Sequence, residues 1–286
     1  MPTKIEKDAV TGTMTTGHEW DGIRELNTPL PRWWLYVLYA TIAWSLVYYV
    51  LYPVLPGVGG ILGWSQRGEL AEKIAAERAR IQPMLERIRT TPVEDLRRTP
   101  GLGEFAYAGG RAAFADNCAP CHGAGGAGAK GGFPSLVDDE WIWGGDLAAI
   151  QRTITFGVRS GHPDTRQSQM PRFGADGILT APQIADTAEY VLSLSGRSTD
   201  EKAAGRARQI FADNCAACHG PAGQGNRELG APSLADQIWL HGGDKASIER
   251  SIHLGRGGVM PAWTDRLDEA TIRMLTFYVH SLGGGR

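Results

Sequence analysis

The sequence predicts a mainly α-helical protein, in which one membrane-spanning helix precedes two tandem copies of one helical module. Three observations support this fold class. An uncharged apolar run of 24 residues covers 33–56. All four cysteines of the 286-residue chain fall into two matching short motifs. The residues that surround the two motifs also match, so the chain contains two copies of one module.

Residues 1–32 form a polar arm, in which we find no apolar run with the cleavage site of a signal peptide. The 24 residues of 33–56 follow. At about 1.5 Å per residue, a helix of this length crosses a hydrocarbon core of roughly 30 Å. Aromatic side chains gather at both ends, as in membrane helices, and Pro53 and Pro56 are expected to end the helix. A buried helix of a soluble domain is the alternative, although so long an uncharged run is unusual there.

Residues 57–107 are expected to form a charged helix and a linker. Apolar residues recur at helical spacing through 66–90, which predicts a surface or partner-facing helix that is interrupted near Pro83. From Thr90 to Gly103 the chain is rich in proline, threonine and arginine, a composition that favours a linker.

Each cysteine motif has the pattern of covalent haem attachment, Cys-x-x-Cys-His. The residues are Cys118, Cys121 and His122 in the first motif, and Cys215, Cys218 and His219 in the second. Two thiols add to the vinyl groups of one haem, and the next residue places an imidazole beneath the iron. We therefore expect two covalently bound haem c groups, with both histidines as axial iron ligands.

Other uses of four cysteines fit the spacing less well. A zinc ribbon closes over about 15–20 residues, whereas 93 residues separate Cys121 from Cys215. A redox pair requires neither the histidine nor a second copy, and a disulfide across two residues would constrain little of the chain. Zinc and disulfides are the alternatives to haem.

The residues around the motifs define two modules, 108–196 and 197–286. Equivalent residues are offset by 97 at the motif and by 90 at a later methionine, because the first module has the longer loop. A Gly-Asp pair in each module is expected to open a helix, with Asp146 or Asp244 as its N-cap. An apolar helix closes each module, and Thr180 begins the first of these with the spacing of a capping box.

The modules resemble class I cytochrome c domains, in which a helix that ends at the haem motif is crossed by a C-terminal helix. The resemblance implies that a proline carbonyl orients the ligating imidazole, and Pro134 and Pro232 lie 12 and 13 residues after the motif histidines. A methionine is the expected sixth ligand, because Met170 and Met260 each stand in a Met-Pro loop at the matching place.

The choice of the sixth ligand has alternatives. His162 in the first module and His241 or His253 in the second are rivals to the methionines, although hydrogen-bonded or surface roles are expected for them. A swap, in which each methionine reaches the iron of the other module, is a further alternative that the sequence leaves open.

The order of arm, membrane helix and paired modules resembles the dihaem subunit III (CcoP/FixP family) of cbb3-type cytochrome c oxidase. Asn-Thr-Pro-Leu-Pro-Arg-Trp-Trp at 27–34 and Gly-Trp-Ser-Gln at 63–66 carry this resemblance on either side of the membrane helix. It implies that a periplasmic donor cytochrome gives electrons to this chain. The chain then passes them through a monohaem cytochrome c subunit to the haem–copper subunit of a proton-translocating oxidase. We expect no catalytic residue here, because six-coordinate iron has no open position for oxygen.

Location and charge follow from these expectations. Haem attachment outside the bacterial cytoplasm places the modules in the periplasm and the N-terminus in the cytoplasm, with a single pass through the inner membrane. The net charge of −2 favours no nucleic-acid partner. Residues 108–196 carry 6 basic and 9 acidic side chains, so we hypothesise that this acidic module receives a basic donor.

Two other functions are compatible with the same features. The first is a free-standing membrane dihaem carrier, or the cytochrome subunit of a periplasmic dehydrogenase. The second is a haem-based gas sensor, in which a methionine detaches to admit a ligand. Co-purification with a haem–copper subunit distinguishes the oxidase subunit from the free-standing carrier or dehydrogenase subunit. Carbon monoxide binding by the reduced chain would favour the gas sensor.

Overall fold

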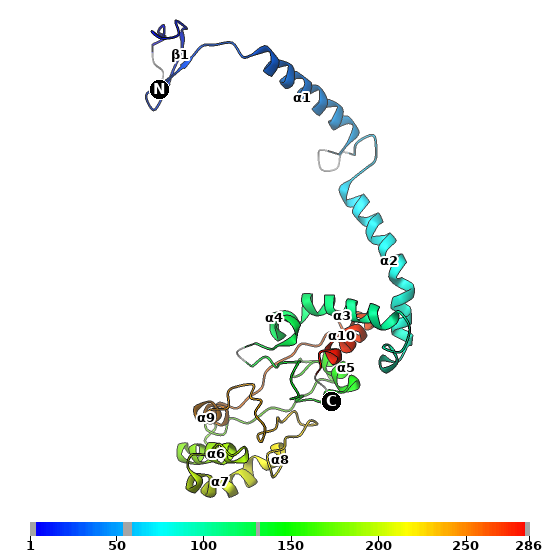
Figure 1. The fold of residues 1–286 in the computed structure, drawn as a ribbon, viewed down its shortest axis with the longest axis vertical. Coiled ribbons are helices and arrows are strands. Elements are labelled where there is room, and N and C mark those ends of the chain that lie inside the picture. Colours follow the sequence, from blue (N-terminus) through cyan, green and yellow to red (C-terminus); the bar gives the residue numbers. More distant parts are fainter. Residues whose placement is uncertain (1–3, 54–58, 130–131, 284–286) are drawn as a thin grey trace. The chain divides into compact units, whose positions relative to one another are not determined.

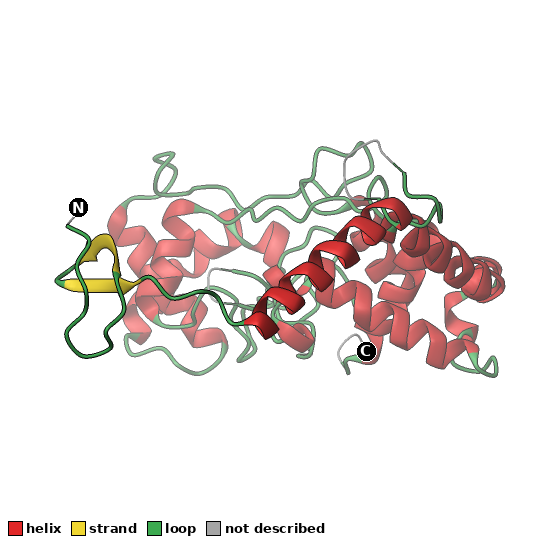
Figure 2. Ribbon diagram, turned by 90° about the horizontal axis from the view of Figure 1, so that it is seen from above, coloured by secondary structure: helices red, strands yellow, loops and turns green. Residues whose placement is uncertain are grey.

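The computed structural model describes residues 4–53, 59–129 and 132–283 (Figure 1). The chain separates into two compact units, Met1–Arg80 and Ile81–Arg286, and each is described by itself. Helices dominate the described residues, in which strands occur only in one small two-stranded ribbon (Figure 2). The predicted fold class, mainly α-helical with one N-terminal apolar helix, is confirmed.

The ribbon lies in the polar arm, for which the sequence analysis made no prediction of secondary structure. β1 (Thr15–Trp20) pairs antiparallel with β2 (Ile23–Leu26), and Trp20 lies opposite Ile23. The two residues between them, Asp21 and Gly22, have φ angles of 48° and 83°. Asp-Gly is a preferred pair for such a two-residue hairpin turn, because both positions require positive φ. This dipeptide was the local signal that the sequence analysis missed.

The apolar run forms α1 (Arg32–Leu51), a helix of 20 residues that is apolar around its whole circumference. It is long and apolar enough to cross a membrane, and none of its side chains is buried within the unit. The helix ends before Pro53, as predicted, and Tyr52 is already extended, which is the conformation that a following proline favours. Pro56 lies outside the described residues. The helix fits a single-pass membrane anchor.

α2 (Gln66–Thr90) runs without a break through Pro83, so the predicted interruption is wrong. Pro83 removes one backbone hydrogen bond, to the carbonyl of Ala79. Both residues are exposed, so water can hydrate that carbonyl and the helix continues.

The chain between α2 and α3 packs closely, although the sequence analysis expected a linker from Thr90 to Gly103. It contains η1 (Val93–Asp95), and Ile88, Leu96 and Leu102 are fully buried on both sides of it. They pack with Met274 and Phe277, which follow more than 150 residues later. Arg273 donates from Nε to the Ile88 carbonyl at 2.8 Å and from Nη2 to the Thr91 carbonyl.

The second unit repeats one set of helices. They are α3 (Leu102–Asn117), α4 (Ala119–His122), η2 (Ala124–Gly126), α5 (Leu147–Phe156), α6 (Ala181–Leu194), α7 (Glu201–Asn214), α8 (Ala216–His219), α9 (Lys245–Leu254) and α10 (Glu269–Ser281). The predicted caps are confirmed. Asp146 and Asp244 accept from the backbone of α5 and α9 at 2.9 and 3.0 Å, and Thr180 forms a capping box at the start of α6.

The described helices of this unit form two bundles, and each bundle draws helices from both modules (Figure 1). In the first bundle, α3 and α5 pack against α10. In the second bundle, α7 and α9 pack against α6. The closing helix of each module therefore completes the bundle that the other module begins.

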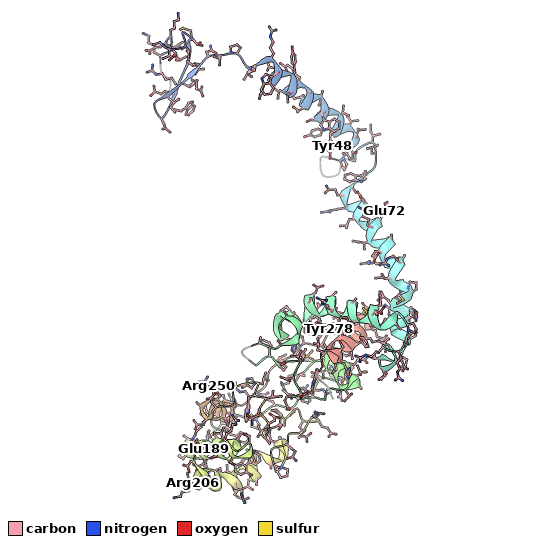
Figure 3. The ribbon with its side chains drawn as sticks, viewed as in Figure 1. Tyr48, Glu72, Glu189, Arg206, Arg250 and Tyr278 are labelled. Atoms are coloured by element: carbon pink, nitrogen blue, oxygen red, sulfur yellow. The ribbon has the colours of Figure 1, made fainter. Side chains whose placement is uncertain are left out.

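The two bundles share one core design. Phe114 on α3 lies 5.4 Å from Tyr278 on α10, and Phe211 on α7 lies 4.9 Å from Tyr190 on α6, measured between ring centroids. Figure 3 labels Tyr278, where α10 lies along α3. At Gly110, a Cβ atom would overlap the Met274 carbonyl, so the first helix crossing requires glycine.

Candidate functional site

Both cysteine motifs lie in a short helical turn at the end of the first helix of a bundle. α3 and α7 stop at Asn117 and Asn214, and α4 and α8 contain the rest of each motif. The first cysteine of each motif is half-buried and the second is exposed. This arrangement leaves one edge of each motif open to solvent.

Burial raises the pKa of the Cys118 and Cys215 thiols to about 11, with a smaller contribution from the second cysteine of each motif. At neutral pH both groups are therefore protonated as thiols. Among the described residues, no three metal-binding side chains come together, and the two cysteine pairs belong to different bundles. The zinc alternative therefore has no support in this structure.

The motif histidines are oriented by the two prolines that the sequence analysis singled out. His122 Nδ1 lies 3.1 Å from the Pro134 carbonyl oxygen, and His219 Nδ1 lies 2.9 Å from that of Pro232. A carbonyl only accepts, so Nδ1 carries the proton and Nε2 keeps a lone pair for a metal. Burial lowers the pKa of both imidazoles, and the hydrogen bonds to the proline carbonyls oppose this effect. The lowered pKa favours the neutral form of the imidazole, which is the form that binds iron.

The two methionines are exchanged between the modules. Met260, from the second module, packs into the core of the first bundle together with Cys118. Met170, from the first module, packs into the core of the second bundle together with Cys215. The structure therefore brings each methionine to the cysteine motif of the other module.

Backbone hydrogen bonds hold the exchanged methionine loops in place. Val158 and Met260 exchange two hydrogen bonds of 2.9 Å, and Met170 N donates to the Arg256 carbonyl at 3.0 Å. Gly157 and Gly255 end the middle helices with φ of 69° and 67°. A Cβ at either glycine would overlap the methionine carbonyl of the other module, so glycine allows the close approach.

Known proteins match this chain over almost its whole length. The family model described as the N-terminal domain of cytochrome oxidase-cbb3, FixP, matches residues 12–59. Models of cytochrome c and of cbb3-type cytochrome c oxidase subunit III match 107–195 and 202–279. A cbb3-type cytochrome c oxidase subunit CcoP of Azospirillum brasilense is 54% identical over 98% of this chain and 99% of its own length. This chain belongs to the CcoP/FixP family.

Other members of the CcoP/FixP family show the same coverage. The FixP subunits of Azorhizobium caulinodans and Bradyrhizobium diazoefficiens are 53% and 50% identical, over 98% of this chain and 96% and 98% of their own lengths. As a CcoP/FixP chain, the protein carries two covalently bound haem c groups and is an electron-transfer subunit of an oxidoreductase complex.

Buried hydrogen-bond donors show that this CcoP/FixP chain fits haem. Trp141 Nε1 and Trp239 Nε1 are buried without a partner, as are one nitrogen each of Arg166 and Arg197. Trp141 packs with the first motif and Trp239 with the second, and Arg197 lies 5.2 Å above the Trp239 ring. An unpaired buried donor costs about 1–3 kcal/mol. The carboxylates of the haem propionates could accept hydrogen bonds from these unpaired donors. The sequence analysis did not identify any of the four residues.

The rival histidines of the CcoP/FixP chain have structural roles. His162 Nδ1 accepts from Asp164 N at 3.1 Å, and its ring packs on Phe156 at 4.9 Å. The rings of His241 and His253 lie against Gly132 and Gly174. The hydrogen bond of His162 agrees with the surface or hydrogen-bonded roles that the sequence analysis expected, whereas His241 and His253 are seen only in packing contacts.

Proposed function

We propose that this chain relays electrons from a periplasmic donor cytochrome toward the oxygen-reducing haem–copper subunit of a cbb3-type oxidase. One observation carries the proposal: in each bundle, the first cysteine of a motif shares a core with one methionine, and the histidine of that motif keeps a free Nε2. His/Met ligation raises the reduction potential of haem, which suits a carrier on the oxidising side of a respiratory chain.

We assign the ligands by bundle and not by module. Haem 1 and haem 2 denote the groups on the first and second motifs. Haem 1 takes Cys118, Cys121, His122 and Met260, with Pro134 as the orienting carbonyl, and haem 2 takes Cys215, Cys218, His219 and Met170, with Pro232. Both irons are then six-coordinate, so oxygen reduction takes place in another subunit.

The partners and the membrane orientation belong to the same proposal. α1 anchors the chain in the inner membrane, with residues 1–32 in the cytoplasm and the two haem modules, 108–196 and 197–286, in the periplasm. The curated relatives are named as oxidase subunits, which supports the haem–copper subunit and a monohaem cytochrome c subunit as partners.

The test removes one haem and then each methionine in turn. In a full-length C215S/C218S chain, which keeps only haem 1, we expect M260L to abolish the methionine–iron charge-transfer band of ferric haem. The matched variant M170L should leave that band in place. Loss of the band in M170L, with no effect of M260L, would show ligation within each module and overturn the assignment.

The relay itself is tested on the wild-type chain. Purification in mild detergent should recover it with the haem–copper subunit. A chain that purifies alone favours the free-standing carrier, and carbon monoxide binding by the reduced chain favours the gas sensor.

A further inference from the structure

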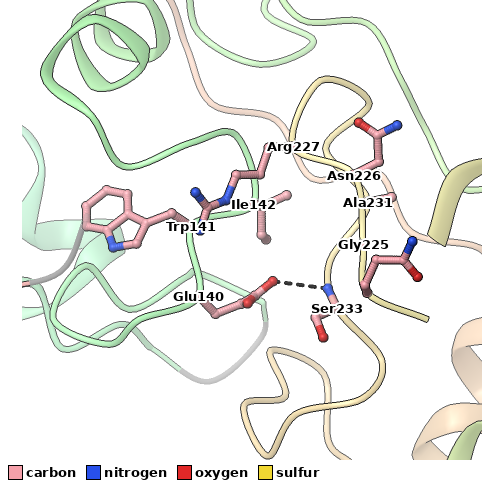
Figure 4. Close-up of a pocket in the computed structure, with 9 residues that line it drawn as sticks. Glu140, Trp141, Ile142, Gly225, Asn226, Arg227, Ala231 and Ser233 are labelled. Carbon is pink, nitrogen blue, oxygen red and sulfur yellow. Dashed lines mark hydrogen bonds between the residues drawn. The ribbon is translucent and has the colours of Figure 1, made fainter. Parts of the chain in front are cut away.

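A carboxylate of the first module is joined to the haem 2 histidine by a continuous chain of hydrogen bonds. Glu140 Oε1 accepts from Ser233 N at 3.1 Å, as drawn in Figure 4. Ser233 follows Pro232, so this N–H and the Pro232 carbonyl belong to one peptide group. That carbonyl accepts from His219 Nδ1 at 2.9 Å. The chain therefore runs from Glu140, through one amide, to the imidazole.

Through these hydrogen bonds, the charge of Glu140 can affect the imidazole of His219. An anionic acceptor on the N–H side polarises an amide, and its carbonyl oxygen becomes a stronger acceptor. A stronger acceptor draws the Nδ1 proton away from the imidazole and raises the basicity of Nε2 toward the iron. A more basic ligand favours ferric over ferrous iron, so ionised Glu140 favours the oxidised form of haem 2.

The position that corresponds to Glu140 in the second module holds an apolar residue. Asp138 Oδ1 accepts from Glu140 N at 3.2 Å, and Asp236 Oδ1 accepts from Ile238 N at 2.9 Å. A tryptophan follows directly in both modules. Ile238 has no acceptor, so it cannot give haem 1 the same chain of hydrogen bonds. The two haems therefore differ at this point of an otherwise repeated structure.

Glu140 lines a cavity of about 380 Å³ together with Arg227 and Asn226 (Figure 4). Burial raises the pKa of its carboxyl above the ordinary range, and the hydrogen bond from Ser233 opposes this effect. Among the described residues, the charged groups that act on Glu140 are Asp236, which raises its pKa, and Arg227, which lowers it. The carboxyl is thus placed to gain and lose a proton while it is joined to the haem 2 ligand.

We propose that Glu140 is a positioning residue for haem 2, which lowers the reduction potential of this haem when ionised and makes that potential depend on pH. The inference rests on the proposed function, since it requires haem on the second motif with His219 as a ligand. As pH rises and Glu140 loses its proton, the potential of haem 2 falls. By linkage, oxidation of haem 2 promotes release of that proton.

The test is a spectroelectrochemical titration of the intact purified complex at several pH values. The E140Q variant keeps an oxygen acceptor for Ser233 and removes only the charge. At pH values above the pKa of Glu140, we expect the ratio of reduced to oxidised haem 2 at a fixed potential to be about threefold higher in E140Q than in the wild type. This ratio corresponds to a rise of about 28 mV in the haem 2 potential, since a tenfold ratio corresponds to 59 mV. The slope of the haem 2 potential against pH should disappear. The matched control D139N removes an adjacent exposed charge and should keep both the ratio and the slope.

Two results would overturn the inference. One is a haem 2 potential in E140Q that equals the wild type and keeps its pH slope. The other needs no variant: a wild-type haem 2 potential that does not change with pH. Haem content and the methionine–iron band, measured on the same samples, test the proposed function separately. A chain with two six-coordinate haems but no effect of E140Q retains the relay and loses only this inference.

Discussion

At the scale of single residues, the buried carboxylate of Glu189 joins three helices of the second bundle. Its side chain is 1% exposed and forms a 2.9 Å ion pair with Lys245 of α9. It also accepts from Ser198 Oγ at 2.7 Å and from the backbone of Thr199 and Asp200, which lead into α7. Burial alone would raise the pKa of Glu189, but these hydrogen bonds outweigh it and lower the pKa to about 2. The ionised form is therefore part of the fold.

We expect E189Q to lower the free energy of unfolding at pH 7 by about 2 kcal/mol, since an ionised acceptor is lost inside the bundle. The pKa of Glu189 in the folded chain, about 2, lies below the ordinary glutamate value of 4.5. The stabilisation is therefore complete above pH 4.5 and is lost as pH falls from there toward about 2. Urea unfolding of both chains at pH 7 and pH 3 should show the difference shrinking in acid.

The control is the exposed pair of Arg206 and Asp186, 2.6 Å apart on the same bundle; Figure 3 labels Arg206 and Glu189. D186N should cost less than about 1 kcal/mol, as for other surface ion pairs. Equal losses in D186N and E189Q would contradict the special role of Glu189.

At the scale of elements, the crossing of α3 and α10 depends on close backbone approach. Gly110 is buried on α3 and faces the Met274 carbonyl and the Cβ of Tyr278. The equivalent position on α7 is Ala207, which is fully buried against α6. The two crossings are therefore alike in topology, but the first has no room for the Cβ that Ala207 carries at the second.

We expect G110V to destabilise the chain by about 3 kcal/mol, at the upper end of overpacking, because the overlap involves backbone. The methionine–iron band of haem 1 should weaken as α10 moves, since Met260 lies in the same core. Gly205 on α7 is the matched control, because a Cβ there meets nothing within 4 Å. G205A should be neutral or stabilise by up to about 1 kcal/mol. A stable G110V chain with an intact haem 1 spectrum would show that the crossing tolerates a side chain.

The sequence predicted the parts of this design that are local. The helix caps depend on residues within one turn, and their spacing was sufficient. The roles of the two proline carbonyls were implied by the family resemblance, and each lies in the loop that follows its motif. The exchange of Met170 and Met260 was not predictable, because each loop has the same local structure whichever motif it serves. An alignment of the two modules places Glu140 opposite Ile238, so the difference between them can be read from the sequence. Its meaning depends on Ser233, which lies 93 residues away, and no local pattern contains that contact.

At the scale of the whole molecule, charge is the property that bears on the donor. Residues 108–196 have 6 basic and 9 acidic side chains, and 197–286 have 11 and 10. The first module contributes α3 and α5 to one bundle and α6 to the other. Its acidic surface is therefore shared between the two bundles and does not mark one haem alone.

We expect electron uptake from a basic periplasmic cytochrome to slow about tenfold as ionic strength rises from 0.01 to 0.15 M, where the screening length falls from about 30 to about 8 Å. Stopped-flow reduction of the intact complex measures this rate. Reduction by a small uncharged reductant is the control and should not change. A donor rate that stays constant with salt would exclude electrostatic steering by the acidic module.

The exchanged closing helices also set an order of events during synthesis. His122 leaves the ribosome 147 residues before Glu269, the first residue of α10. At about 5–20 residues per second, that interval is about 7–30 s. For that time the pocket around Cys118 lacks one wall, and a bulky porphyrin can reach the Cys118 thiol before α10 packs against α3.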